Sequence, residues 1–379
     1  MLMRPQLSAT LDGCTIVVTA DRRRSELAAA LERHGARVRH APVLSIVPHA
    51  DDATLSVATR ALIADPPDIV VVTTGVGLRG WMEAADEEGL GDHLHRALTD
   101  ARFIARGPKA RGAIQQAGFT AQWVSESETA ADVARYLSAQ QLNGARVAIQ
   151  HHGAGADGLD ELCIRHGADV VSLTVYRWGP PADPEVVGQS IRDAATGDVD
   201  AVVFTSAPGA SAWLAAAGRE GAVPTIARRT LGRRLLVAAV GPIAAAPLDA
   251  AGITATVADR GRLGALVRTV VSHFASGSHA ATETTGGRLE LRSGGVVLDG
   301  AFLPLSRTCA AVLELLYAAD GAVVTRRALQ RALPRSTENT HAVDMAVARL
   351  RNALDSSDII RTVVKRGYRL DVREGLTTA

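Results

Sequence analysis

An internal repeat is the feature that most restricts how this chain can fold. The segment DIVVVTTGVGLRGWMEAA at 68–85 aligns with DAVVFTSAPGASAWLAAA at 200–217, and RHGA at 33–36 recurs at 165–168, both at a spacing of 132 residues. A third pair, spaced by 134, is ARGPKARGAIQQAG at 105–118 and AVGPIAAAPLDAAG at 239–252. Similarity at a fixed spacing indicates a duplicated unit, so we expect two homologous halves of about 130 residues each.

Each half alternates strand and helix patterns. The first half reads CTIVVTA, RSELAAALERHGA and RVRHAPVLSIV, and the second reads ARVAIQ, GLDELCIRHGA and DVVSLTVYRW. Short Val- and Ile-rich runs separated by helical patterns that end at Gly are typical of βα units in a mainly parallel sheet. Two such lobes are expected to form a cleft, the usual ligand position in open α/β sheets.

Cysteine and apolar patterns exclude several classes of protein. Cys14, Cys163 and Cys309 are far apart and form no CxxC, so neither a disulfide framework nor a zinc site is expected, and a reducing cytoplasm is favoured. The N-terminus lacks the pattern of a signal peptide. The longest apolar run, LLVAAVGPIAAAPL at 235–248, is too short and too broken to span a bilayer, so no membrane role is expected.

Charge separates the C-terminal part from the rest of the chain. Residues 1–287 hold 27 Lys and Arg against 30 Asp and Glu, whereas residues 288–379 hold 14 against 10. A local basic excess is typical of a part that binds nucleic acid. The small polar residues ASGSHAATETTGG at 275–287 predict a flexible linker ahead of a separate domain at 288–374.

The C-terminal domain has its own order of elements. Short β segments (RLELR, GVVLDG, AFLPL) precede a helix expected from Ser306 as N-cap to Gly321 as its C′ residue. A second helix is expected near Thr325, a third over 339–354, and a hairpin around Lys365, Arg366 and Gly367.

The third helix is amphipathic. At 100° per residue, one side holds Val343, Val347, Leu350 and Leu354. The opposite side presents His341, Met345, Ala348, Arg349 and Asn352. For an isolated helix this pattern favours a polar face that is merely exposed to solvent. The elements around the helix are what favour a binding face instead.

With its neighbours, residues 288–373 resemble the winged-helix output domain of response regulators of the OmpR/PhoB class. The resemblance is carried by LPLSRTCAAVLELLYAADGAVVTRRALQRAL, VDMAVARLRNAL and IIRTVVKRGYRL. It implies a recognition helix in the major groove, a wing at the minor groove, and a packing role for Tyr368. The DNA-binding residues implied are His341, Ala348, Arg349, Arg351, Asn352, Lys365 and Arg366. Arginine suits this role because its planar fork can grip phosphate or guanine.

Two departures from that family concern the wing and the second helix. Leu333 stands where an aromatic residue is common, and Lys365 stands where the wing usually has Gly. They put the shape of the wing and contact with RNA polymerase in question more than DNA binding. The strand ends VVVTT, VVFTS and VVTA offer no phospho-accepting Asp, so the body is not a receiver domain.

Two short motifs in the body favour structural interpretations. Residues 75–80, GVGLRG, match GxGxxG but lie outside the first βα unit of their lobe, so a Gly-rich turn is favoured over dinucleotide binding. The pair His151 and His152 is interpreted as polar loop residues rather than as haem or metal ligands.

Residues 13–274 resemble uroporphyrinogen-III synthase. The resemblance is carried by VVTADRRRSELAAALERHGARV, TVYRW, DAVVFTSAPGASAWL, AAVGPIAAAPLDAAGI and GALVRTVVSHF. It implies an α/β body at 1–274 with two lobes of parallel sheet, joined by crossing strands near 41–48 and 172–178. Lobe one would cover about 1–42 and 178–274, and lobe two about 46–172, followed by the winged helix-turn-helix domain.

That family closes hydroxymethylbilane to uroporphyrinogen III without metal or cofactor, so none is expected here. The matching positions imply Tyr176 as a catalytic residue. The ligand-binding positions implied are Thr73, Thr74, Gly107, Thr205, Ser206 and Gly241. Helix N-termini at these strand ends can hold carboxylates, although capping and turn geometry explain Thr, Ser and Gly there equally well, and Tyr176 could be a packing residue.

Departures leave the activity open. Ala244 and Ala110 replace a Thr of the family, and Gln150 stands where Arg is common. We therefore expect a regulator that senses a tetrapyrrole-like or other anion and binds double-stranded DNA as a homodimer. From the fusion alone, genes of sirohaem-dependent nitrite and sulfite assimilation are the expected targets. The alternatives are an active synthase with an appended DNA-binding domain, and a regulator whose body is only a scaffold.

Overall fold

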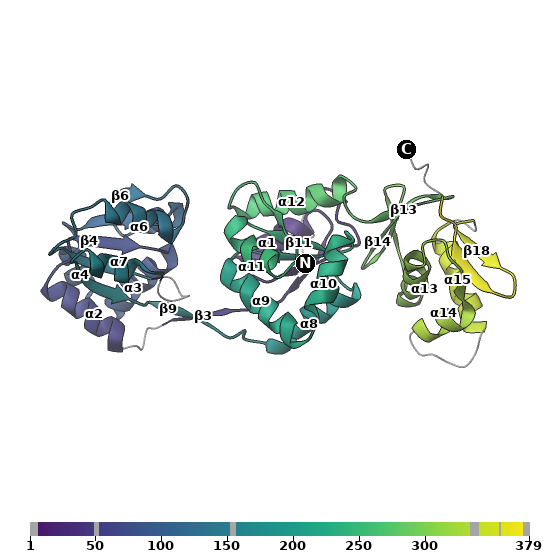
Figure 1. The fold of residues 1–379 in the computed structure, drawn as a ribbon, viewed down its shortest axis with the longest axis horizontal. Coiled ribbons are helices and arrows are strands. Elements are labelled where there is room, and N and C mark those ends of the chain that lie inside the picture. The colour runs from purple at the N-terminus through teal and green to yellow at the C-terminus, as the bar shows by residue number, and fades with distance from the viewer. Residues whose placement is uncertain (1–6, 49–52, 152–156, 334–340, 356–357, 374–379) are drawn as a thin grey trace. The chain divides into compact units, whose positions relative to one another are not determined.

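The structure is a computed structural model that describes residues 7–48, 53–151, 157–333, 341–355 and 358–373. The chain separates into two compact units, and Figure 1 labels the helices and strands that make them up. Residues 45–180 form one unit, which we call lobe two. The other unit, 1–44 with 181–379, contains an α/β part that we call lobe one and a C-terminal winged-helix domain that begins at residue 281.

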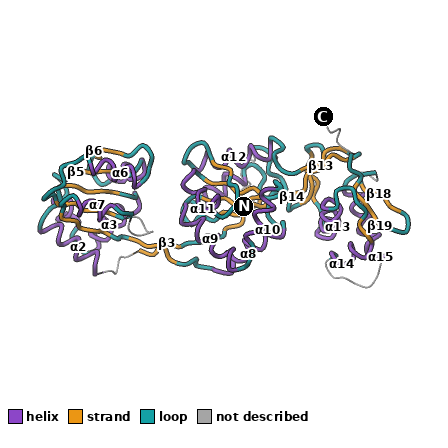
Figure 2. The backbone as a smooth tube through the Cα atoms, viewed as in Figure 1, coloured by secondary structure: helices purple, strands orange, loops and turns teal. Residues whose placement is uncertain are grey.

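Lobe two is built on a parallel sheet with strand order β6-β5-β4-β7-β8. The strands are β4 (Ile69–Val72), β5 (Arg102–Ala105), β6 (Ala121–Val124), β7 (Arg146–Gln150) and β8 (Asp169–Leu173). Helices α2 (Ala53–Ala64), α3 (Gly75–Glu87), α4 (Gly91–Ala97) and α5 (Pro108–Gln116) cover one face, and α6 (Ala130–Ser138) and α7 (Leu159–Arg165) cover the other. Figure 2 shows the strands of the chain in orange and the helices in purple. Since both faces are buried, the central strands are continuously apolar.

Lobe one repeats this architecture with strand order β12-β11-β10-β1-β2. The strands are β1 (Thr15–Val18), β2 (Arg37–His40), β10 (Ala201–Phe204), β11 (Leu236–Ala239) and β12 (Thr256–Val257). Helices α1 (Arg24–Glu32) and α12 (Leu263–Ala275) pack on one face. Helices α8 (Pro184–Thr196), α9 (Ala207–Arg219), α10 (Val223–Leu231) and α11 (Pro242–Ala250) lie on the opposite side of the sheet.

The expected duplication is confirmed by the sheets. Strands β10, β11 and β12 take the places of β4, β5 and β6, while β1 and β2 take those of β7 and β8. The pairing Ile69 with Val147 in lobe two matches Ala201 with Ile16 in lobe one. Lobe one is therefore assembled from the two ends of the body, and lobe two is inserted between them.

Two long strand patterns of the sequence are each divided in the structure. RVRHAPVLSIV forms β2 and then β3 (Ser45–Pro48), and DVVSLTVYRW forms β8 and then β9 (Tyr176–Gly179). Strands β3 and β9 overlap the two segments expected to form the crossing strands, and they pair antiparallel with each other. In the first case Pro42 lies in the break, where its missing N–H would interrupt a ladder.

The C-terminal domain is a winged helix. An antiparallel sheet of β13 (Ala281–Thr284), β14 (Gly287–Arg292), β15 (Gly295–Leu298) and β16 (Ala301–Pro304) precedes the helices α13 (Arg307–Ala318), α14 (Arg326–Ala332) and α15 (His341–Ala353). The second sheet, ordered β17-β19-β18, comprises β17 (Val324–Thr325), β18 (Ile360–Val363) and β19 (Gly367–Leu370). Ser306 caps α13 as expected, and α14 starts near Thr325 as expected, with Thr325 as its N-cap.

Two local expectations are corrected. The 275–287 segment is not wholly an irregular linker, because β13 lies in it and Ala280 N–H donates to Arg233 C=O at 2.9 Å. Helix α13 ends earlier than expected, with Ala319 as C-cap and Asp320 as the C′ residue, ahead of Gly321. Both Asp320 and Gly321 adopt positive φ, so the turn needs two left-handed residues rather than one. In the described part of the chain, no helix has the length and apolarity needed to cross a membrane.

Candidate functional site

The hydroxyls that follow β4 in lobe two serve the fold itself. Thr73 is buried, and its Oγ1 donates to the Gln150 carbonyl oxygen at 2.8 Å. Thr74 caps α3 by accepting from Gly77 N–H at 3.1 Å. The structure thus brings both predicted threonines to the carboxyl ends of the strands, in capping and cross-strand roles.

Tyr176 joins this cluster from β9. Its Oη donates to Thr74 Oγ1 at 3.4 Å, and Thr74 N–H donates to Gln150 Oε1 at 3.2 Å. The Tyr176 side chain is only 4% exposed and stands edge-on to Trp178, with ring centroids 5.8 Å apart. Tyr176 is therefore packed within lobe two, and its hydroxyl contacts Thr74 at the carboxyl ends of the strands.

Arg106 is a polar residue of this edge that the sequence analysis missed. It follows β5 directly and precedes Gly107, the N-cap of α5. Burial lowers the pKa of its guanidinium, while Asp157, Tyr176 and Glu128 act in the opposite direction. Among the residues that the structure describes, its guanidinium forms no ion pair within 4.0 Å. The internal repeat could have identified this residue, because it aligns the charged Arg106 of lobe two with the apolar Val240 of lobe one.

His151 holds the end of β7 to the start of α7. The imidazole is buried, with Nε2 2.8 Å from Asp160 Oδ1 and Nδ1 3.6 Å from Asp157 Oδ1. Burial alone would lower the pKa of His151, but the two carboxylates outweigh burial and raise it to about 9. His151 is thus a buried cation between carboxylates, while His152 lies outside the described residues. Within those residues, no three His, Cys, Asp or Glu side chains are placed to hold a metal ion.

The corresponding edge of lobe one is simpler. Ser206 caps α9 by accepting from Gly209 N–H at 3.2 Å, and Thr205 beside it is half-buried. Gly241 begins α11 in an extended conformation, and a Cβ built there would meet no atom within 4 Å. Packing therefore does not require glycine at this position. Thr19 takes the place of Gln150, and its Oγ1 donates to the Val203 carbonyl oxygen at 2.9 Å.

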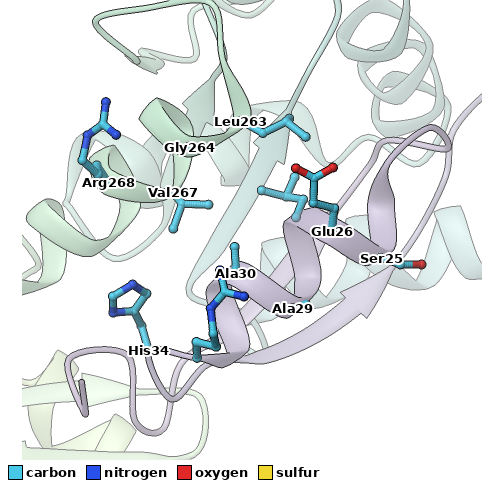
Figure 3. A pocket seen from close by; sticks show the side chains of 11 residues that line it. Ser25, Glu26, Ala29, Ala30, His34, Leu263, Gly264, Val267 and Arg268 are labelled. Carbon is cyan, nitrogen blue, oxygen red and sulfur yellow. The ribbon is translucent and has the colours of Figure 1, made fainter. Parts of the chain in front are cut away.

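A surface pocket lies elsewhere in lobe one, between α1 and α12 (Figure 3). Its volume is about 630 Å³, and Glu26 and His34 line it from the α1 side while Leu263 and Arg268 line it from α12. None of the predicted site residues lines this pocket. It belongs to the helix layer and not to the strand ends, so it adds nothing to the ligand site.

Helix α15 carries the predicted DNA-binding face. Val343, Ala346, Val347 and Leu350 are buried in the domain core. His341, Met345, Ala348, Arg349 and Asn352 are exposed. The amphipathic pattern is confirmed, and it leaves a polar face of α15 open to a partner.

Arg351 differs from its neighbours on this helix. Its Nη2 donates to the Ile360 carbonyl oxygen at 2.6 Å and to Thr362 Oγ1 at 3.0 Å. The guanidinium also lies 5.8 Å from the centroid of the Tyr368 ring. The structure therefore directs Arg351 to β18, where it holds the wing against α15. This arrangement differs from the direct DNA contact that the resemblance implied.

A second network connects α14, α15 and the wing. Tyr368 Oη donates to Asp344 Oδ1 at 2.6 Å, and Arg326 Nε donates to the same oxygen at 3.0 Å. The hydrogen bond from Tyr368, together with Arg326, lowers the pKa of Asp344. Tyr368 is buried, which confirms the packing role expected for it. The network fixes the helix and the wing relative to each other.

The wing tip exposes two cations. Lys365 and Arg366 are both exposed at the turn between β18 and β19. Lys365 adopts φ 60, the left-handed conformation that explains why glycine is usual at this position. A non-glycine residue there costs about 1 kcal/mol in strain. Lys365 therefore places a positive charge at a left-handed position of the turn.

Comparisons with known proteins agree with this division of the chain. The model of the family described as uroporphyrinogen-III synthase HemD matches residues 25–268, and that described as transcriptional regulatory protein, C terminal, matches residues 300–370. The uncharacterized protein YjjA of Bacillus subtilis is 27% identical over 263 residues, 69% of this chain and 96% of YjjA. A putative uroporphyrinogen-III synthase of Methanothermobacter thermautotrophicus is 26% identical over 240 residues, 63% of this chain and 89% of its own length.

A solved structure supports the fold of the body. A mutant uroporphyrinogen III synthase from the extremely thermophilic bacterium Thermus thermophilus is 26% identical, with a TM-score of 0.57. The match covers 69% of this chain and 99% of the Thermus chain. The two-sheet architecture described above is therefore that of known structures.

Proposed function

This chain belongs to the uroporphyrinogen-III synthase HemD family and ends in an OmpR/PhoB-type DNA-binding domain, and on that premise we propose that it is a transcriptional regulator. In this proposal the body binds a polycarboxylate anion of the tetrapyrrole class, and the winged-helix domain binds double-stranded DNA as a homodimer. The observation that carries the proposal is the exposed polar face of α15 beside a wing tip with two cations.

The proposed DNA contacts divide by position. Arg349, His341 and Asn352 project from the exposed face of α15 and are assigned to base edges and nearby phosphates. Lys365 and Arg366 at the wing tip are assigned to phosphates. Arg351 is a positioning residue, because its guanidinium is bonded to β18.

The proposed ligand-binding residues of each lobe lie at the carboxyl ends of its own strands. Arg106 offers a half-buried cation, and a carboxylate would restore the interactions that burial removes from it. Gly107 and Gly241 begin helices at these strand ends, where N–H groups can bind an anion. Thr74 and Ser206 already cap helices, so the fold uses their hydroxyls before any ligand does.

A second candidate function is retained synthase activity, because the family model spans most of the body. Two observations weigh against it. Ala110 and Ala244 are buried and supply no hydroxyl, and Tyr176 is enclosed by the lobe. Incubation of the full chain with hydroxymethylbilane, with separation of type I and type III products, decides between the functions. Excess type III product over a no-protein control would establish the enzyme.

DNA binding is tested on the full chain by measuring affinity for a selected duplex at several salt concentrations. The substitution Arg349→Ala should weaken the free energy of DNA binding by about 1–3 kcal/mol and relax the sequence preference, because it removes a base contact. Arg366→Ala should weaken binding to all sequences and reduce the salt slope by about 1. Arg307→Ala, an exposed arginine at the start of α13, is the matched control. Unchanged binding in both wing and helix variants would contradict the assignment.

The targets and polymerase contact are further parts of the proposal. The fusion itself motivates control of sirohaem-dependent nitrite and sulfite genes. Unchanged expression of those genes in a deletion strain would remove that part. Contact with RNA polymerase is tested by transcription from a target promoter with purified components.

A further inference from the structure

A buried carboxylate lies at the amino end of the lobe-one sheet. Asp200 directly precedes β10 and is 3% exposed. Its Oδ2 accepts from Thr15 N–H at 2.7 Å and from Ser293 Oγ at 2.5 Å, and its Oδ1 accepts from Ser293 N–H at 2.9 Å. Burial raises the pKa of Asp200 to about 6, although the hydrogen bonds from Ser293 and Thr15 oppose that rise. Ser293 belongs to the turn between β14 and β15 of the winged-helix domain.

Lobe two has a carboxylate at the equivalent position, but the β14–β15 turn does not cover it. Asp68 precedes β4 as Asp200 precedes β10, and its Oδ2 accepts from Arg146 N–H at 2.8 Å. The backbone bonds are also equivalent, from Asp68 N–H to Arg146 C=O and from Asp200 N–H to Thr15 C=O, both at 2.9 Å. Asp68 is exposed, however. The carboxylate is therefore a common feature of the two sheets, and its burial in lobe one comes from the β14–β15 turn.

Arg292 makes the second part of this contact. Its side chain is 5% exposed, and Nη1 donates to the Thr10 and Asp12 carbonyl oxygens, both at 2.8 Å. Its Nε donates to Glu290 Oε1 at 2.9 Å, and the guanidinium lies 5.4 Å from the centroid of the Phe274 ring. A buried guanidinium needs such partners, because an unpaired buried charge costs several kcal/mol. Lobe one supplies both of the backbone acceptors.

The backbones also approach closely. Gly294 N–H donates to the Gly13 carbonyl oxygen at 2.8 Å. A Cβ on Gly13 would overlap the Phe302 ring of β16. In lobe two the equivalent residue, Gly144, has nearly the same φ (78 against 76), yet open space surrounds its Cβ position. Close packing is thus confined to the lobe that carries the winged-helix domain.

The turn leads directly into the core of the winged-helix domain. Strands β14 and β15 contribute Leu289 and Val296 to the cluster that contains Leu313 of α13 and Val347 of α15. A displacement of the turn would therefore disturb the packing beneath the proposed recognition helix. The residues Arg292, Ser293 and Gly294, with their partners in lobe one, are called the hairpin joint below.

We propose that the hairpin joint couples lobe one energetically to the winged-helix domain, so that DNA binding stabilises lobe one and a ligand that alters lobe one alters DNA affinity. The proposal rests on the proposed function for its DNA arm. Coupling of this kind is reciprocal, since each partner changes the affinity for the other by the same factor. The joint provides a physical connection, because separating the two parts breaks buried charge-assisted hydrogen bonds at Asp200 and Arg292.

The test is amide hydrogen exchange of the full chain, alone and with a nonspecific DNA duplex at low salt. In the native chain, DNA should slow exchange in α15 and also in β1 and β10 of lobe one. In Arg292→Ala, DNA should still slow exchange in α15, but its effect on β1 and β10 should be lost. Without DNA, β1 and β10 in this variant should exchange roughly tenfold faster than in the native chain. Arg307→Ala is the matched control and should behave as the native chain.

The outcomes separate the two proposals. Protection of α15 with no change in β1 and β10 of the native chain would overturn the coupling and leave DNA binding intact. No protection of α15 would contradict the proposed function, and the exchange of β1 and β10 in Arg292→Ala without DNA would then decide the joint. Native-like exchange there would overturn it. Ser293→Ala, which removes only the Oγ bonds, should give a smaller effect of the same kind and guards against misfolding of the first variant.

Discussion

The two lobes share one sheet order but differ at opposite ends of their strands. At the carboxyl ends, lobe two has Arg106 and Gln150 where lobe one has Val240 and Thr19. At the amino ends, each lobe has an aspartate, which is exposed in lobe two and covered by the winged-helix domain in lobe one. The additional polar side chains therefore lie at the carboxyl edge of the lobe-two sheet. The contact with the winged-helix domain lies at the amino edge of the lobe-one sheet.

This difference shows how a duplicated fold can acquire separate roles without changing its core. The apolar strands must stay buried between helix layers, so both copies keep them. Strand ends lie outside those layers, where substitutions affect local contacts more than the packing of the sheet. Four predictions test this comparison of the two lobes, from the largest expected effect to the smallest.

The first prediction compares Gly13→Ala with Gly144→Ala. Both residues have positive φ, but only Gly13 faces the Phe302 ring. Gly144→Ala should lower the free energy of unfolding of lobe two by about 1 kcal/mol, whereas Gly13→Ala should destabilise lobe one by about 3 kcal/mol. Native-state hydrogen exchange of β7 and β1 measures the two lobes separately. Equal effects would mean that Phe302 does not restrict this position.

The second prediction compares Asp200→Ala with Asp68→Ala. Loss of the Asp200 carboxylate leaves the Ser293 N–H without its acceptor, removes the bonds from Thr15 N–H and Ser293 Oγ, and should cost about 2 kcal/mol in lobe one. Asp68 is exposed, and water can replace it, so its loss should cost under about 1 kcal/mol. The same exchange measurement applies. A larger loss of stability in Asp68→Ala than in Asp200→Ala would contradict the distinction between the covered aspartate of lobe one and the exposed aspartate of lobe two.

The third prediction makes the carboxyl end of lobe two resemble that of lobe one. Arg106→Val should lower the affinity of the full chain for uroporphyrin, a polycarboxylate probe, by about tenfold, since it removes a charge-assisted contact. Arg111→Val, an exposed arginine on α5, is the control and should bind as the native chain does. Fluorescence titration of the probe gives both affinities. Equal affinities would remove Arg106 from the ligand site.

The fourth prediction concerns pH and lobe two alone. His151 has a pKa of about 9 in the folded chain against an ordinary value of 6.5, so its contribution is complete below about pH 6.5 and is lost as the pH rises through 9. We expect the free energy of unfolding of lobe two to fall by roughly 1–2 kcal/mol between pH 7 and pH 10, because the charged bonds to Asp157 and Asp160 weaken. Lobe one, with Ala20 at the equivalent place, provides the internal control. In His151→Gln, this pH dependence of lobe two should disappear when unfolding is followed by hydrogen exchange.

Several features were readable from the sequence because they are local or periodic. The spacing of 132 residues predicted two similar sheets, and the structure contains them. The period of α15 predicted which side is buried, from Val343 to Leu350. Ser306 was identifiable as an N-cap because a capping side chain acts within three residues of itself.

Other features depended on partners that are distant in the chain. Tyr176 belongs to the predicted set, but its burial in the core of lobe two and its bond to Thr74 connect positions that are 102 residues apart. Arg351 was expected at DNA because its position on the helix does not reveal that β18 offers it a carbonyl oxygen. Arg106 was missed because a single arginine before a Gly-Pro turn has no distinctive pattern.

The sequence by itself determined the duplicated α/β body, the separate basic winged-helix domain and the two faces of its recognition helix, since each follows from a repeat, a local charge balance or a helical period. Only the tertiary structure decided that Asp200 is buried and Asp68 is exposed. The two residues occupy the same place in the repeat, and what distinguishes them is Ser293, 93 residues beyond Asp200. Periodicity reports which way a side chain points, but the element that covers it is chosen by contacts between distant parts of the chain.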